Sequence, residues 1–168
     1  MKRVLLIFAM MLATTCLPMQ AQQVYDMVFE SATRTVNNPM SDYTQIRIAQ
    51  FKKTALTYLR QKAETADTLV NMRLLDYQAY YLQQFITFYL KQIIRYSGEQ
   101  QKGMRQNVIR LFIKSSLDCP LWNDPDTEIT QSYIGDTEEL TPFSLDTDWQ
   151  KAYEEVDFLI KQMPAQIP

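Results

Sequence analysis

Three acidic residues at alternating positions, Asp124, Asp126 and Glu128, are the first candidates for chemistry in this chain. Carboxylates gathered in one loop are common ligands of calcium. An EF-hand loop that began at Asp124 would need glycine at its sixth place and glutamate at its twelfth, where Ile129 and Gly135 stand instead. The stretch therefore favours a solvated turn, and we expect no metal there.

A second acidic group offers the paired carboxylates that glycoside hydrolysis uses, one as the acid and one as the base. Its members are Asp136, Glu138, Glu139, Asp146 and Asp148. Acidic loops are commonly just solvated, and these residues lack an evident set of aromatic residues that would form a sugar cleft around them. A carboxylate-dependent hydrolase is therefore only the third of the functions that we consider.

Histidine is absent from the whole sequence, and cysteine occurs only at Cys16 and Cys119. Without histidine, Ser–His–Asp and Cys–His nucleophiles and histidine-based metal sites are excluded. Asp118 beside Cys119 would raise the pKa of the thiol, which favours a packing role for this cysteine. We predict no catalytic residue, no cofactor and no metal, and hence a protein that is not an enzyme.

Charge is unevenly distributed along the chain. Residues 34–114 carry 13 basic and 5 acidic side chains, whereas residues 115–168 carry 2 basic and 12 acidic ones. One interpretation is internal complementarity, with the acidic part folded over the basic helices. The other is a basic face that binds an anionic partner such as a glycan, a lipid headgroup or an acidic protein. That face would consist of Lys102, Arg105, Arg110 and Lys114. The total of −2 gives no indication of a nucleic-acid partner.

The first 21 residues have the layout of a secretory signal peptide. Two basic residues precede an apolar run over residues 4–13, which is too short for a stable transmembrane helix. Ala21 provides a small residue for cleavage, so we predict export, with a mature domain of residues 22–168 in the periplasm or outside the cell. Lipid anchoring through Cys16 is the alternative, although the residues before it fit a lipidation site poorly.

Helical periodicity dominates the remaining chain. The predicted helices span residues 22–37, 42–63, a start between 68 and 72 up to 96, 97–119 and 147–163, with a short helix over 124–133. Capping boxes are expected at Asp42 with Gln45, Ser97 with Gln100, and Thr147 with Gln150. We therefore predict an all-α, single-domain helical bundle of about five main helices, with an irregular acidic segment before the last one.

The stretch from Leu74 to Ile94 holds six of the eighteen Tyr and Phe residues. Apolar side chains cover roughly 200° of this helix, and the rest carries glutamines and charges that a membrane span would not tolerate. We predict the central helix of the bundle, packed by two or three neighbours. The alternative is a pocket that would make the chain a carrier of an apolar small molecule. The pocket would be lined by Tyr77, Tyr81, Phe85 and Phe88.

Two further aromatic residues are candidates for partner binding. The last helix buries one face that begins at Trp149, whereas Phe158 falls on the opposite side among charged residues. Trp122 lies in the irregular segment. Because aromatic side chains anchor many protein interfaces, Phe158 and Trp122 are predicted contacts for a partner.

Three stretches of the chain resemble those of small exported helical proteins of gut-type Gram-negative anaerobes. They are NPMSDYTQIRIAQFKKTALTYL, LLDYQAYYLQQF and TPFSLDTDWQKAY. The resemblance covers residues 24–162 and points to a domain-of-unknown-function family. It implies export and a helical fold, and it implies no catalytic residues.

These observations favour an exported, non-catalytic protein that acts by binding a protein or an anionic partner in the envelope or outside the cell. The carrier of an apolar small molecule is the alternative, and the hydrolase comes third.

Overall fold

The computed structural model describes residues 23–66, 72–125, 128–133 and 140–163. The predicted signal peptide, with Cys16 and the cleavage site at Ala21, lies outside the described residues. Export and lipid anchoring therefore stay predictions. No helix in the described ranges combines the length and the apolar character that crossing a membrane requires.

Helices make up most of the described part of the chain. The α-helices are α2 (Gln23–Asn37), α3 (Tyr43–Ala66), α4 (Met72–Arg95), α5 (Lys102–Asp118) and α6 (Trp149–Gln162), and a short 3-10 helix, η1 (Glu99–Gln101), precedes α5. Strands β1 (Ile129–Tyr133) and β2 (Leu140–Ser144) form an antiparallel hairpin. The predicted all-α, single-domain bundle of five main helices is confirmed, and the hairpin falls within the segment that was expected to be irregular.

The start of α3 follows the predicted capping box. The Asp42 N–H donates to Gln45 Oε1 (3.2 Å), and the Gln45 N–H donates to Asp42 Oδ1 (2.7 Å). The capping box predicted at Ser97 and Gln100 is wrong. The 3-10 helix η1 lies between Ser97 and α5, and no side chain caps the start of α5. The box at Thr147 is also wrong. Asp148 caps α6, and its carboxylate accepts a hydrogen bond from the Lys151 N–H (3.3 Å).

The short helix predicted over residues 124–133 is wrong, because its second half forms β1. Ile129 pairs with Ser144, and Tyr133 pairs with Leu140. Pro142 lies opposite Gln131 and is tolerated because each strand of a two-stranded hairpin has an open edge that needs no N–H donor. Ile129 and Thr130, which begin β1, are β-branched and fit a strand, and pairing with the next strand along the chain decides the conformation.

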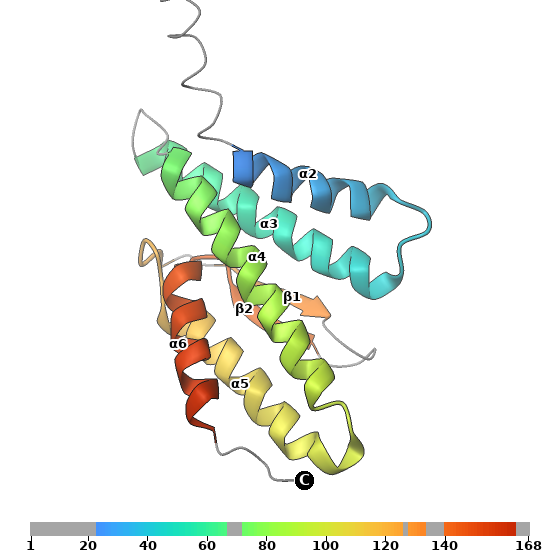
Figure 1. Cartoon of the computed structure of the whole chain (residues 1–168). Coiled ribbons are helices and arrows are strands. Elements are labelled where there is room, and N and C mark those ends of the chain that lie inside the picture. The colour runs from blue at the N-terminus through green and yellow to red at the C-terminus, as the bar shows by residue number, and fades with distance from the viewer. Residues whose placement is uncertain (1–22, 67–71, 126–127, 134–139, 164–168) are drawn as a thin grey trace, which may run out of the picture.

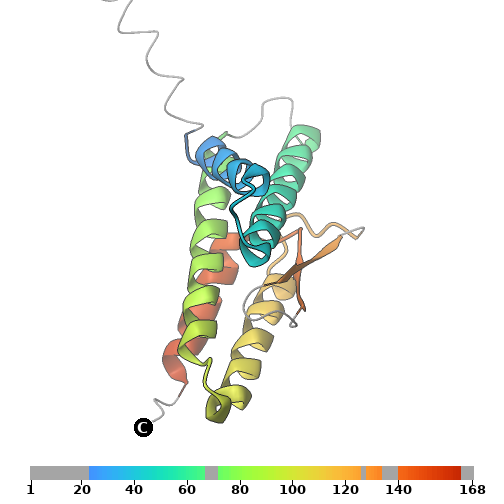
Figure 2. The ribbon, with the colours of Figure 1, turned by 90° about the vertical axis from the view of Figure 1, so that its right-hand side faces the viewer.

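α4 lies at the centre of the fold, with α2 and α3 at one end and α5 and α6 at the other (Figure 1). The hairpin lies between α3 and α5, where β1 contacts α3 and β2 contacts α5 (Figure 2). The hairpin thus connects the two helical pairs, and Phe143 of β2 packs on the rings of Phe85 and Tyr89 of α4. This arrangement confirms that α4 is the central helix.

The core is built from aromatic rings around Phe85 of α4. The centroid of the buried Phe85 ring lies 5.0 Å from that of Phe112, 5.6 Å from that of Phe143 and 5.4 Å from that of Trp149. These rings come from α5, β2 and α6, and such edge-to-face pairs each contribute about 0.5–1.5 kcal/mol beyond their burial. The wide apolar arc of α4 is explained by its contacts with helices on both sides. Its buried residues are Leu75, Gln78, Ala79, Leu82, Phe85, Ile86, Tyr89, Gln92 and Ile93.

The segment from Thr141 to Trp149 is buried at every position except Pro142. The side chains of Thr141, Asp146, Thr147 and Asp148 have partners inside the protein, as is usual for buried polar groups, whereas the buried Trp149 Nε1 has none among the described residues. The Thr141 hydroxyl lies 2.8 Å from the Tyr89 hydroxyl, and the Thr147 hydroxyl lies 2.7 Å from the Ser144 carbonyl oxygen. Residues 141–149 of the acidic segment are therefore part of the protein core.

Candidate functional site

Asp146 organises the loop between α5 and the hairpin. This residue is 2 % exposed, and its carboxylate accepts hydrogen bonds from the N–H groups of Leu121 (3.1 Å), Trp122 (2.9 Å) and Asp124 (2.7 Å). Asn123 within this loop has a left-handed backbone with φ of 54°, which asparagine tolerates better than most residues. The buried carboxylate fixes the loop and places the Asp124 side chain against α3.

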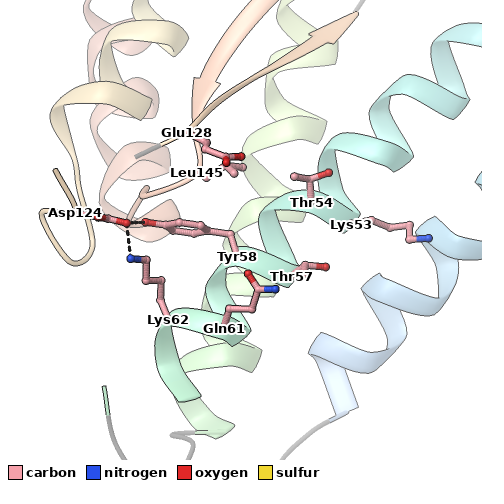
Figure 3. A pocket seen from close by; sticks show the side chains of 9 residues that line it. All are labelled: Lys53, Thr54, Thr57, Tyr58, Gln61, Lys62, Asp124, Glu128 and Leu145. Atoms are coloured by element: carbon pink, nitrogen blue, oxygen red, sulfur yellow. Dashed lines mark hydrogen bonds and ion pairs between the residues drawn. The ribbon is translucent and has the colours of Figure 1, made fainter. Parts of the chain in front are cut away.

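A hollow of about 470 Å³, which we call the α3 hollow, lies between this loop and α3 (Figure 3). It is lined by Lys53, Thr54, Thr57, Tyr58, Gln61, Lys62, Asp124, Glu128 and Leu145. The Tyr58 hydroxyl donates to Asp124 Oδ2 (2.8 Å), and Lys62 Nζ lies 2.5 Å from the same oxygen. The hollow is therefore polar, and its most buried charged group, the Asp124 carboxylate, is already bound by Tyr58 and Lys62.

The α3 hollow has two basic and two acidic side chains, and one of each forms an ion pair. The Asp124 side chain is only 8 % exposed in its ion pair with Lys62. Lys53 Nζ lies 5.7 Å from the centroid of the Phe29 ring on α2, and Glu128 is exposed at another wall. The two lysines belong to α3, and the two carboxylates belong to the segment after α5. The ion pair between Lys62 and Asp124 therefore links this segment to α3. The predicted internal complementarity of charge is present at this contact.

Three of the carboxylates considered for calcium or for glycoside cleavage make structural contacts, whereas Glu128 is exposed. Asp124 binds Lys62, and Asp146 holds the loop. Asp148 caps α6 and accepts a hydrogen bond from the Gln78 amide (3.1 Å). Burial alone would raise the pKa of Asp148, but hydrogen bonds from Gln78 and Lys151 outweigh burial and hold this pKa below its usual range. The remaining candidates, Asp126, Asp136, Glu138 and Glu139, lie outside the described residues.

Cys119 packs against the core beside an acidic neighbour. Its Sγ lies 3.4 Å from Glu155 Oε2, which also accepts a hydrogen bond from the Ser115 hydroxyl (2.6 Å). Burial, aided by the hydrogen bond to Glu155, raises the pKa of the Cys119 thiol to about 11. A thiol with such a pKa is a poor nucleophile at neutral pH because the thiolate is the reactive form.

The four residues predicted to line a ligand pocket are separated by the structure. Phe85 is fully buried in the aromatic core, whereas Tyr77 is 47 % exposed. Tyr81 and Phe88 are partly buried and pack against the core from outside. None of these four side chains lines the α3 hollow, the hollow between α2 and α3 at Lys52, or the hollow at Tyr25 and Arg60. Phe85 is therefore a core residue, and the other three belong to a surface.

That surface is an aromatic face of α4 and α6, made of Tyr77, Tyr80, Tyr81, Phe88 and Tyr153. The Tyr81 ring centroid lies 4.9 Å from that of Tyr77 and 5.2 Å from that of Tyr80. Across the helix interface, Tyr153 lies 5.9 Å from Tyr81 and 5.8 Å from Phe88. Hydrogen bonding with Tyr77 raises the pKa of Tyr81.

Tyr80 and Tyr153 belong to the aromatic face but were not among the residues predicted for the pocket. Tyr80 lies three residues after Tyr77 and one before Tyr81, so helical spacing alone could have joined it to them. The contribution of Tyr153 depends on how α6 docks on α4, which periodicity does not specify. A contiguous aromatic surface therefore emerges only from the folded chain.

The two predicted aromatic anchors differ in their surroundings. Phe158 is 60 % exposed on α6, on the side where it was expected. Trp122 is partly buried and packs edge-to-face on Tyr58, with ring centroids 6.1 Å apart. Phe158 is thus available to a partner, whereas Trp122 also supports the wall of the α3 hollow. Partner binding by either residue stays a prediction.

The predicted basic residues all lie on α5 but do not form one uncompensated set. Lys102 and Arg110 are exposed, and Arg105 is partly buried. Lys114 Nζ lies 2.6 Å from Asp118 Oδ2 at the end of the same helix. Binding of an anionic partner to these residues stays a prediction.

No known protein family, curated protein sequence or solved structure matches this chain. The resemblance to exported proteins of anaerobes therefore stays a prediction, and function has to be inferred from the residues of the chain itself.

Proposed function

We propose that this chain is an exported, non-catalytic protein that binds a protein partner through the aromatic face of α4 and α6. One observation carries the proposal. Tyr77 and Tyr80 are 47 % and 48 % exposed although each lies in ring contact with Tyr81. Tyrosine provides a large and rigid contact area at a low cost in conformational entropy, and it is enriched among the residues that dominate binding energy.

Ring contacts beneath the aromatic face hold it in place before a partner binds. Tyr81 contacts Tyr153 of α6, and Phe88 contacts both Tyr153 and the buried Phe112. The outer tyrosines therefore stand on side chains that the core already holds in place. A partner that docks there would order few additional groups, and this lowers the entropic cost of association.

The other functions have weaker support. A carrier needs the Tyr and Phe side chains around a cavity, but Phe85 is enclosed by core rings. A hydrolase needs free carboxylates, but Asp146 and Asp148 are engaged in backbone contacts. The exposed Phe158 and the basic residues of α5 would serve as secondary contacts for the same partner or for an anionic one.

Site-specific photo-crosslinking in the producing cell tests the proposal. The photoreactive residue p-benzoylphenylalanine replaces Tyr80 in one variant and Tyr43 in the control. Tyr43 is a suitable control because it is a similarly exposed tyrosine, at the start of α3. We expect a discrete crosslinked protein from position 80, its loss when Tyr77→Ala is added, and its absence from position 43.

Equal crosslinking from both positions, or none from position 80 under conditions where the protein is exported and folded, would contradict the proposal. A co-purifying apolar molecule in native mass spectrometry, without a crosslinked protein, would replace it with the carrier function. Export itself is tested by intact mass, which should show a mature chain that begins at Gln22. A lipid mass on Cys16 would show anchoring instead.

A further inference from the structure

A second hollow, which we call the α2–α3 groove, shares no lining residue with the aromatic face or with the α3 hollow. Its volume is about 400 Å³, within the range of about 300–1,000 Å³ that is usual for small-molecule sites. It is lined by Val28, Ser31, Ala32, Thr35, Asn38, Ser41, Gln45, Ile48, Ala49, Lys52 and Gln83. Lys52 provides the only formal charge among these lining residues.

Lys52 is partly buried without a carboxylate partner. Its Nζ donates to Gln83 Oε1 (2.8 Å), and within the described ranges no acidic oxygen lies at ion-pair distance from it. Burial lowers the pKa of Lys52. An ammonium group has three N–H donors, so one amide oxygen leaves two of them for water or a ligand.

The other polar groups of the groove also present donors. Asn38 Oδ1 accepts from the Met40 N–H (3.0 Å), and Gln45 Oε1 accepts from the Asp42 N–H (3.2 Å). Each of these side chains therefore has its NH₂ group left over. Ser31 and Ser41 add hydroxyl groups that make no side-chain hydrogen bond within the described ranges. The groove thus combines one positive charge with several neutral donors.

We propose that the α2–α3 groove binds a small, oxygen-rich molecule that carries one carboxylate, with the carboxylate on the Lys52 ammonium. The single positive charge matches a single negative charge, and burial strengthens such a charge-assisted hydrogen bond. The hydroxyl and amide donors at the rim bind the remaining oxygens of the ligand. The apolar side chains of Val28, Ala32, Ile48 and Ala49 cover its C–H groups. This inference does not depend on the proposed protein partner, because the groove and the aromatic face share no residue.

Calorimetric titration of the full chain with two hydroxylated carboxylates, glucuronate and gluconate, tests the site. Glucose is the neutral match for glucuronate, and inorganic phosphate is the probe for a more highly charged anion. Lys52→Met removes the charge and keeps an unbranched apolar stem, whereas Lys53→Met makes the same change at the neighbouring position outside the groove. We expect saturable binding of at least one carboxylate that weakens about tenfold or more in Lys52→Met and less than about twofold in Lys53→Met.

A labelling experiment on the unmodified sequence covers the case in which Lys52→Met does not fold. A saturating carboxylate should protect Lys52, but not Lys53, from acylation by an amine-reactive ester, as quantified by mass spectrometry of the two lysines. Acylation of Lys52 that is unchanged by either carboxylate would overturn the proposal. It would also be overturned if glucose or phosphate bound as tightly as the carboxylates, or if Lys52→Met folded and bound them like the unmodified chain.

Discussion

Replacing Asp146 with asparagine should destabilise the fold far more than the same change at a partly exposed aspartate on the helix surface. Asp146 Oδ1 accepts from the N–H groups of Leu121 and Trp122, and Oδ2 accepts from the N–H of Asp124. An asparagine side chain at this position would keep one acceptor oxygen. Its NH₂ group would have to face at least one backbone N–H, and two donors that face each other cannot form a hydrogen bond.

The expected cost follows from these three bonds. A hydrogen bond to a charged group contributes about 1.5–3 kcal/mol, and a neutral one about 0.5–1.5 kcal/mol. Asp146→Asn loses one bond and weakens two, whereas burial of an amide costs less than burial of a carboxylate. The net loss in the free energy of unfolding should be about 2–4 kcal/mol, a large share of the roughly 5–15 kcal/mol that is typical of single domains.

Urea denaturation followed by circular dichroism measures this difference. Asp157→Asn is the matched control, because Asp157 Oδ2 lies 2.5 Å from the exposed Lys161 on the surface of α6. Ion pairs at the surface contribute at most about 1 kcal/mol. If Asp146→Asn lowers the free energy of unfolding no more than Asp157→Asn does, Asp146 does not hold the loop in the way described here.

Three further predictions concern the core, the cap of α6 and the thiol. Ile86→Ala truncates a fully buried side chain and leaves a cavity, so it should lower the free energy of unfolding by about 2–5 kcal/mol in urea denaturation. An unchanged denaturation midpoint would show that this face of α4 does not lie in the core. The pKa of Asp148 is lowered in the folded state, so its contribution is present above the unfolded value of about 3.9 and is lost as the pH falls through the folded value. The difference in stability between the unmodified chain and Asp148→Asn should therefore shrink as the pH drops below about 4, and a constant difference would refute the pKa shift. The thiol pKa of about 11 predicts that iodoacetamide alkylates Cys119 at pH 8 about tenfold or more slowly in the native chain than in urea, as quantified by peptide mass spectrometry; equal rates would show an ordinary thiol.

The features that the sequence predicted correctly depend on local patterns. The helical periodicity of residues 74–94 specifies a helix that is apolar over a wide arc, and such a helix has to be central. Asp42 and Gln45 satisfy each other within one turn, so their capping box needs no distant partner. The exposure of Phe158 follows from the opposite face of the same helix being apolar.

The features that were missed depend on partners outside the segment in which they lie. β1 is a strand because residues 140–144 pair with it, and Asp124, where the predicted short helix began, is held by Asp146 and Lys62 instead. Thr147 and Asp148 are both good helix caps. The contact of Thr147 with the Ser116 carbonyl oxygen (3.0 Å) leaves the cap to Asp148.

The candidate binding surfaces also depend partly on local spacing and partly on contacts between helices. The sequence predicted that Tyr77 and Tyr81 share a stripe of α4, but the docking of α6 brings Tyr153 beside them and encloses Phe85. The lysine of the α2–α3 groove gives no signal in the sequence, because its neutral surroundings come from three different helices.

Affinity for the partner identified by crosslinking at position 80 tests the central claim most directly. The measurement compares the unmodified chain, the double variant Tyr77→Ala with Tyr80→Ala, and the control Tyr43→Ala, each with its helical content verified by circular dichroism. The aromatic face predicts that the double variant binds about tenfold or more weakly, whereas Tyr43→Ala binds like the unmodified chain. A folded double variant that binds the partner with unchanged affinity would contradict the assignment of this face as the binding surface.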